Sequence, residues 1–197
     1  MGAWIGTTAI WLSKNFKEVI AVEADHKSLE CLKLNLAASE CDNIKICEKP
    51  ITATGQTVVF GPRGGVLNES ISCVKDAIAG PLDYSVKSLT FKELINEYAY
   101  SKKITFIKCD IEGGEENIIE DLLYFAFYNN CSVHLSFHHG WWVSKKIEDY
   151  EYLFDFFEVV NYSQVTSVVH FVRENPFGAL LLRPKRDAGD LIIRERI

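Results

Sequence analysis

Residues 106–116 read FIKCDIEGGEE, and this stretch decides the fold class. Residues 104–107 are β-branched or aromatic and lack helical spacing, which is typical of a strand. Apolar residues then recur at helical intervals between residues 118 and 126. The pattern therefore predicts a strand, an acidic glycine turn and a helix. Ligands of open α/β sheets lie beyond the carboxyl ends of parallel strands, so we expect the functional site at this turn.

The four carboxylates of this turn have two interpretations. Glu115 and Glu116 fall in the first turn of the predicted helix, where the helix dipole favours negative charge. Solvation of the turn and capping of the helix therefore explain these two residues. Asp110 and Glu112 flank an isoleucine at the end of the strand, and capping explains them poorly. We favour a functional role for Asp110 and Glu112.

Length and composition predict one domain over residues 1–184 and a charged, loose tail over residues 185–197. The chain has 197 residues, of which 48% are apolar, which suffices for one well-buried core. A net charge of −6 without a lysine-rich segment argues against general nucleic-acid binding. The sequence has no apolar run long enough to span a membrane and no signal-peptide pattern, so we expect a cytoplasmic protein.

The cysteine pattern also favours the cytoplasm, where thiols stay reduced. None of them forms a Cys-x-x-Cys pair, and several fall inside predicted strands or helices, so we interpret them as reduced thiols rather than disulfides or zinc ligands. The six are Cys31, Cys41, Cys47, Cys73, Cys109 and Cys131.

The N-terminal residues predict a ligand-binding turn. Gly2 and Gly6 open an apolar helical pattern, and such a turn lets a ligand approach the backbone closely. Residues 17–23 form a predicted buried strand that ends in Glu23, and Asp25 is placed to cap the following helix. An acid about twenty residues after a glycine turn is typical of a carboxylate that binds ribose hydroxyls. The glycine turn and Glu23 together therefore indicate a ligand that resembles adenosine.

A strand normally precedes such a glycine turn, and the sequence has none there. In a doubly wound sheet the missing strand would be central, and buried backbone groups left without partners cost roughly 1–3 kcal/mol each. We therefore expect the first strand to be missing from this N-terminus, and the natural chain to begin before Met1.

The middle of the chain predicts two strands, a long loop and a helix. Residues 43–50 and 56–60 have strand patterns. Residues 61–81 are rich in glycine and lack periodicity, so they indicate a substrate flap or a disordered segment. Thr90 and Glu93 form a capping box that begins the helix before the acidic turn.

The C-terminal part predicts a strand over residues 131–137 that leads directly into His138 and His139. Because adjacent histidines cannot both follow core spacing, we expect at least one of them to be functional. A helix over residues 149–157 and closing strands over residues 165–172 and 178–182 follow. A hairpin between the last two would make the final strand antiparallel.

Several of these segments resemble the FkbM-type methyltransferase family, which uses S-adenosylmethionine. IKCDIEGGEENII at residues 107–119 is similar to the family's Lys-x-Asp-Ile-Glu-Gly-x-Glu signature. GAWIG at residues 2–6 resembles its first cofactor loop, and VEAD at residues 22–25 resembles its ribose motif. The chain departs from the family at Trp4, where asparagine is usual, and at Ala24, where proline is usual.

The resemblance implies a Rossmann-like, doubly wound, mostly parallel α/β sheet of seven strands, of the class I methyltransferase type. It implies methyl transfer to an oxygen of a sugar or another small molecule. Our candidate catalytic residues are Asp110, Glu112 and His138, which follow the two strands that end at this edge of the sheet. The implied cofactor-binding residues are Gly2, Ala3, Trp4, Ile5, Gly6, Glu23, Ala24 and Asp110.

Three alternatives remain open at this point. A divalent ion on Asp110, Glu112 and His138 or His139 is an alternative to a metal-free site, which we favour. An NAD-dependent sugar oxidoreductase would share the glycine turn and Glu23, but the turn lacks the middle glycine of Gly-x-Gly-x-x-Gly. A relative that binds the cofactor without catalysis is the third alternative.

Overall fold

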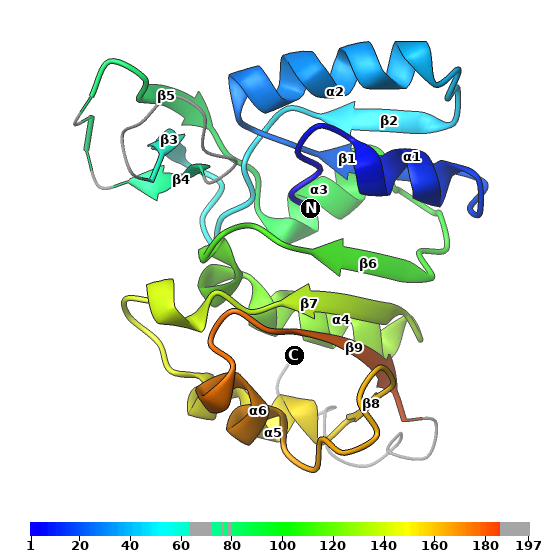
Figure 1. Cartoon of the computed structure of the whole chain (residues 1–197), viewed down its shortest axis with the longest axis vertical. Coiled ribbons are helices and arrows are strands. Elements are labelled where there is room, and N and C mark those ends of the chain that lie inside the picture. Colours follow the sequence, from blue (N-terminus) through cyan, green and yellow to red (C-terminus); the bar gives the residue numbers. More distant parts are fainter. Residues whose placement is uncertain (64–71, 76, 79, 186–197) are drawn as a thin grey trace.

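The structure is a computed structural model that describes residues 1–63, 72–75, 77–78 and 80–185 (Figure 1). Its strands form a two-stranded, a three-stranded and a four-stranded sheet. The prediction of an α/β fold is therefore confirmed, whereas the prediction of a single, mostly parallel sheet of seven strands is wrong for the described residues.

The two-stranded sheet contains β1 (Val19–Val22) and β2 (Ile44–Cys47), which are parallel. Helix α1 (Thr7–Ser13) packs on β1. Helix α2 (His26–Ala38) joins the two strands and buries its leucines at positions 29, 32 and 36. It begins as predicted, because the Asp25 carboxylate accepts a hydrogen bond from the Ser28 N–H at 2.9 Å.

The four-stranded sheet has the order β6-β7-β9-β8. Its strands are β6 (Phe106–Cys109), β7 (Ser132–Ser136), β8 (Phe157–Val159) and β9 (Ala179–Pro184). Strands β6 and β7 are parallel, and β9 is antiparallel to both of its neighbours. The prediction of an antiparallel last strand is confirmed.

The first three residues connect these two sheets through backbone hydrogen bonds. The Met1 amino group donates to the Lys108 carbonyl at 2.6 Å, and the Asp110 N–H donates to the Met1 carbonyl at 3.3 Å. On the other side, the Ala3 N–H donates to the Val22 carbonyl at 2.9 Å. The N-terminal segment therefore lies between the ends of β1 and β6.

The third sheet contains β3 (Thr57–Pro62), β4 (Ser72–Lys75) and β5 (Tyr84–Lys87), all antiparallel, in the order β4-β3-β5. It lies to one side of the other two sheets (Figure 1). The prediction of a loop over residues 61–81 is therefore corrected, since β4 and the end of β3 fall within it. Residues 64–71, 76 and 79 of that segment lie outside the described residues.

The remaining α-helices contribute buried residues to the main hydrophobic core. Helix α3 (Phe91–Tyr98) begins with the predicted capping box, and α4 (Ile119–Tyr128) packs on β7. A 3-10 turn, η1 (Gly114–Asn117), precedes α4. The other elements are η2 (His139–Trp141), η3 (Ile147–Tyr150), α5 (Glu151–Phe154) and α6 (Val168–Glu174).

Two predictions near the C-terminus are wrong. Residues 168–174 form α6 instead of a strand, because Ser167 caps a helix whose valines at 168, 169 and 172 are buried on one face. The helix predicted over residues 149–157 is shorter, since α5 is one turn long and β8 begins at Phe157. The predicted tail falls, from residue 186 onward, outside the described residues.

All six cysteines are free thiols. Among the described residues, no helix has the length and apolar character needed to cross a membrane.

Candidate functional site

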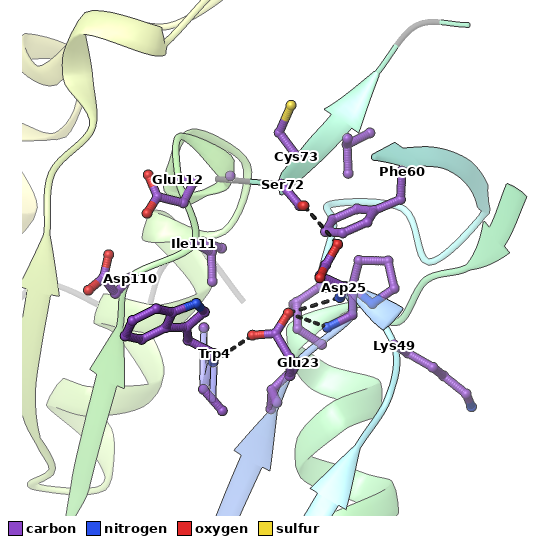
Figure 2. Close-up of a pocket in the computed structure, with 18 of the residues that line it drawn as sticks. Trp4, Glu23, Asp25, Lys49, Phe60, Ser72, Cys73, Asp110, Ile111 and Glu112 are labelled. Atoms are coloured by element: carbon purple, nitrogen blue, oxygen red, sulfur yellow. Dashed lines mark hydrogen bonds between the residues drawn. The ribbon is translucent and has the colours of Figure 1, made fainter. Parts of the chain in front are cut away.

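A cavity of about 340 Å³ lies beyond the carboxyl ends of β1 and β6 (Figure 2). Its size falls within the range of about 300–1,000 Å³ that is common for ligand pockets. The N-terminal turn, the end of β1, the acidic turn after β6 and the small sheet all contribute to its wall. The residues that carry polar side chains there are Thr7, Thr8, Glu23, Asp25, Lys49, Ser72, Cys73, Lys108, Asp110 and Glu112, together with Trp4.

The N-terminal turn lies directly against the acidic turn. Gly2 has a φ of +70°, and a Cβ added there would lie 1.7 Å from the Asp110 carbonyl oxygen, so only glycine permits this approach. Ala3 and Trp4 line the cavity with it. Of the other predicted loop residues, Ile5 accepts a hydrogen bond from Asn35 and Gly6 begins α1. Neither of these two residues lines the cavity.

Glu23 organises the wall at the end of β1. Its Oε2 accepts the Trp4 N–H at 2.7 Å, and its Oε1 accepts the N–H groups of Ala24 and Asp25, each at 2.9 Å. Burial raises the pKa of the Glu23 carboxyl above its ordinary value. Since a carboxylate oxygen accepts about two hydrogen bonds, Oε2 keeps one position for a ligand hydroxyl.

The small sheet supplies site residues that sequence reasoning missed. The Ser72 hydroxyl donates to Asp25 Oδ2 at 2.9 Å, and the Tyr84 hydroxyl donates to the Ala24 carbonyl at 2.5 Å. Phe60 lines the cavity from β3. Phe60 and Ser72 lie far from Asp25 in sequence, which left no local signal, and only the placement of the sheet brings these two residues to the cavity.

Asp110 lies at the opposite side of the cavity from Glu23, with Trp4 between the two (Figure 2). Its Oδ2 accepts a hydrogen bond from Lys108 Nζ at 2.8 Å. Burial would raise the pKa of the Asp110 carboxyl, but the hydrogen bond and charge of Lys108 outweigh it and hold this pKa below its ordinary value. Asp110 is therefore a stable anion at the cavity wall.

His138 meets the acidic turn because β6 and β7 are adjacent and parallel. Its Nε2 lies 3.2 Å from Glu112 Oε2 and 3.6 Å from Asp110 Oδ1. Its Nδ1 lies 2.9 Å from Glu115 Oε1. Burial would lower the pKa of His138, but the hydrogen bond to Glu115 and the surrounding carboxylates outweigh burial and raise it. The three residues predicted as catalytic are thus brought together.

Glu115 belongs to this cluster, and sequence reasoning missed it. Its side chain is fully buried, so the interpretation as a solvated turn residue is wrong. Its Oε1 accepts the Ile111 N–H at 2.7 Å and its Oε2 accepts the Gly113 N–H at 2.8 Å. These bonds fix the carboxylate against the His138 ring.

Glu116 is also buried, and it holds a different loop. Its carboxylate accepts the N–H groups of Val143, Ser144 and Lys145 and the Ser144 hydroxyl, at 2.5–2.8 Å. Burial would raise the pKa of Glu116, but these hydrogen bonds outweigh it and hold the pKa below its ordinary value. Glu116 therefore anchors the segment that follows the histidines.

Aromatic residues pack around the two histidines. The Trp141 ring stacks on the imidazole with 5.3 Å between centroids, and the Arg63 guanidinium lies 4.3 Å over the Trp141 ring. Arg63 also donates to the Glu112 carbonyl at 2.6 Å, which ties the end of β3 to the acidic turn. The His139 ring instead packs edge-on against Trp142. Of the two adjacent histidines, only His138 faces the carboxylates.

Comparison with known protein families decides the classification. The Methyltransferase FkbM domain matches residues 2–163, which is most of the chain. The chain belongs to the FkbM methyltransferase family.

A solved structure supports the same fold. The crystal structure of methyltransferase FkbM from Methylobacillus flagellatus KT matches with a TM-score of 0.56 and 14% sequence identity. The match covers 92% of this chain and 41% of that chain, so this chain spans less than half the length of the solved protein. Among curated proteins, no significant match was found.

Membership of the FkbM family implies the use of S-adenosylmethionine, and the cavity residues fit such a ligand. Gly2 and Ala3 expose their backbone at the cavity wall. Glu23 Oε2 has a free acceptor position that suits a ribose hydroxyl. The Asp110 carboxylate suits the amino group of the methionine part. Trp4 and Glu112 both have positive φ, +49° and +56°. Strained residues of this kind cluster at ligand sites.

Proposed function

We propose that this FkbM-family domain is an S-adenosylmethionine-dependent methyltransferase that methylates an oxygen of a sugar or another small molecule. The proposal rests mainly on one observation. A single cavity is lined by a candidate ribose acceptor, Glu23, and by the two carboxylates, Asp110 and Glu112, that contact His138. A cofactor bound at Glu23 and an acceptor bound beside Asp110 and Glu112 would meet within this cavity.

S-adenosylmethionine would supply a methyl group on a sulfonium centre. Glu23 would bind the ribose hydroxyls, and the backbone of residues 2–4 would allow close approach. Asp110, an anion held by Lys108, would bind the methionine amino group. These residues fix the cofactor in position, because in-line transfer needs the acceptor oxygen aligned with the methyl carbon.

Glu112 and His138 would bind the acceptor hydroxyl and take up its proton. Their Oε2 and Nε2 atoms lie 3.2 Å apart, so one hydroxyl can contact both. Burial raises the pKa of the Glu112 carboxyl, which makes it a stronger proton acceptor. Trp141, stacked on His138, would hold the imidazole in this orientation.

Titration calorimetry with S-adenosylmethionine and with NAD tests the cofactor. We expect S-adenosylmethionine to bind and NAD not to bind. Binding of NAD without binding of S-adenosylmethionine would favour the NAD-dependent sugar oxidoreductase and overturn the proposal.

Incubation with methyl-labelled S-adenosylmethionine and a panel of glycans, nucleosides and cell extracts tests the reaction. We expect a labelled product whose methyl carbon is attached to oxygen, as determined by NMR. A methyl group on nitrogen would contradict O-methylation. Cofactor binding with no labelled product from any acceptor would instead point to a binding-only relative.

A further inference from the structure

Arg63 follows directly after β3 and contacts two groups of the candidate site that lie far from it in sequence. Its Nη2 donates to the Glu112 carbonyl oxygen at 2.6 Å, and its guanidinium lies 4.3 Å over the Trp141 ring. A guanidinium can form both contacts at once, because its N–H donors lie in its plane and its faces stack on aromatic rings. Arg63 therefore joins the small sheet to the acidic turn and to the segment after β7.

The contact with Glu112 holds a backbone conformation that is costly for a residue with a side chain. Glu112 has a φ of +56° and Gly113 has one of +96°. The peptide group between them is held on both sides, since its N–H donates to Glu115 Oε2 and its carbonyl accepts from Arg63. The N–H and C=O of a trans peptide point in opposite directions, so rotation of this peptide breaks both bonds. The direction of the Glu112 side chain depends on this peptide, because backbone angles decide which rotamers are allowed.

The contact with Trp141 extends to His138. The Trp141 ring stacks on the imidazole with 5.3 Å between centroids and 9° between planes. Gly113 leaves room for this packing, because a Cβ added there would lie 3.0 Å from Arg63 Nη2 and 3.2 Å from Trp141 Cβ. Both contacts of Arg63 thus meet at Gly113, and removal of the guanidinium would release the peptide and the Trp141 ring together.

We propose that Arg63 is a positioning residue that holds the Glu112 carboxylate and the His138 ring in their relative orientation. It would act through the Glu112 carbonyl and the Trp141 ring, which are the groups it contacts. Glu112 Oε2 and His138 Nε2 lie 3.2 Å apart, and one hydroxyl can contact both only while the two side chains keep their directions. The inference rests on the proposed function, which assigns these two side chains to the acceptor hydroxyl.

NMR of the protein without cofactor or acceptor tests this role. The stacked Trp141 ring should shift the carbon-bound protons of the His138 ring upfield. Spectra of His138→Ala and Trp141→Ala assign this signal and define its position without the stack. In Arg63→Ala, we expect the signal to move towards its position in Trp141→Ala. The Gly113 amide should exchange with solvent at least about tenfold faster, because its peptide loses a charged hydrogen bond.

Further variants separate position from charge. Arg63→Lys keeps the positive charge but lacks the planar group that donates to a carbonyl and covers a ring at once, so it should lose the His138 signal as Arg63→Ala does. Arg183→Ala is the matched control, because Arg183 is an exposed arginine paired with Glu158, and it should leave both signals unchanged. Since Arg63 is exposed, its variants should fold, and thermal melting verifies this.

Turnover shows whether this positioning serves the reaction. In the assay with methyl-labelled S-adenosylmethionine, Arg63→Ala should reduce turnover per folded molecule at least about tenfold, a part of the acid–base assistance expected from the site. The affinity for S-adenosylmethionine should stay nearly constant in calorimetry. If the wild-type protein methylated no acceptor, the proposed function would fail, while the NMR signals would still decide the role of Arg63.

Three outcomes would overturn the inference. The first is a folded Arg63→Ala variant with unchanged His138 and Gly113 signals, which would show that the two contacts position nothing. The second is an Arg63→Lys variant that keeps both wild-type signals, since charge alone would then suffice. The third is unchanged turnover in Arg63→Ala despite altered signals, which would leave Arg63 with a purely structural role.

Discussion

At the scale of single residues, Glu23 accepts three backbone N–H groups and is proposed to bind the cofactor ribose, and its replacement should affect both. In Glu23→Ala, a ribose hydroxyl loses a charged acceptor worth about 1.5–3 kcal/mol. We expect the affinity for S-adenosylmethionine to fall about tenfold to a hundredfold, as measured by calorimetry. The N–H groups of Trp4, Ala24 and Asp25 lose the same acceptor, so the melting temperature should fall too.

Glu18→Ala is the control for this substitution, because Glu18 pairs with Lys45 and Lys102 and does not line the cavity. Unchanged affinity in a folded Glu23→Ala variant would remove Glu23 from the cofactor site.

The cluster around His138 should control turnover rather than cofactor binding. Glu112→Gln and His138→Ala should each reduce turnover by roughly 10²–10⁴-fold, the range of lost acid–base assistance. The affinity for S-adenosylmethionine should stay nearly constant, whereas Asp110→Asn should reduce both quantities. Steady-state kinetics combined with calorimetry separates these effects. If turnover per folded molecule were preserved, the cluster would have only a structural role.

At the scale of elements, Glu116 links the start of α4 to the loop after η2, and its replacement should destabilise the protein. Glu116→Gln loses charged hydrogen bonds to three backbone N–H groups and one hydroxyl. We expect a loss of roughly 2–3 kcal/mol. In a domain of this size that loss lowers the melting temperature by about 4–12 °C.

The effect of Glu116→Gln should depend on pH. Because the folded-state pKa of Glu116 is lowered, its contribution is present above the unfolded pKa of about 4.3 and disappears as pH falls through the folded value. Thermal melts of both proteins should therefore differ at pH 7 and converge towards pH 3. An equal difference at both pH values would contradict this assignment.

At the scale of the whole molecule, all three sheets contribute to one cavity, and the fluorescence of Trp4 should report whether a ligand occupies it. The Trp4 side chain lines the cavity and is 45% exposed, so a bound ligand should cover it. S-adenosylhomocysteine should change the tryptophan fluorescence of the protein, and Trp4→Phe should abolish most of this change. Trp11→Phe is the matched control, since Trp11 is 63% exposed outside the cavity. A response that survives Trp4→Phe would place the ligand elsewhere.

The arrangement of the sheets explains why residues far apart in sequence form this cavity. The parallel register of β6 and β7, with Cys109 opposite Leu135, brings the acidic turn beside His138. The small sheet adds Phe60 and Ser72 from one side, and Arg63 ties it to Glu112. The N-terminal segment joins the ends of β1 and β6.

The sequence by itself determined the features that depend on local contacts. The strand, acidic turn and helix of residues 106–128, the Asp25 cap and the capping box at Thr90 all join groups a few residues apart. The signature in residues 107–119 likewise indicated the family, since it consists of neighbouring residues. Such patterns are readable because helices and turns are stabilised largely by neighbours in sequence.

Only the tertiary structure decided how distant groups are paired. The contact of Glu115 with His138 spans 23 residues, and nothing local distinguishes a buried, paired carboxylate from a solvated one. The valines of residues 168–172 favour a strand by propensity, yet burial against the core and the Ser167 cap made them a helix. Burial and long-range pairing depend on how strands align, and that alignment is a property of the whole chain.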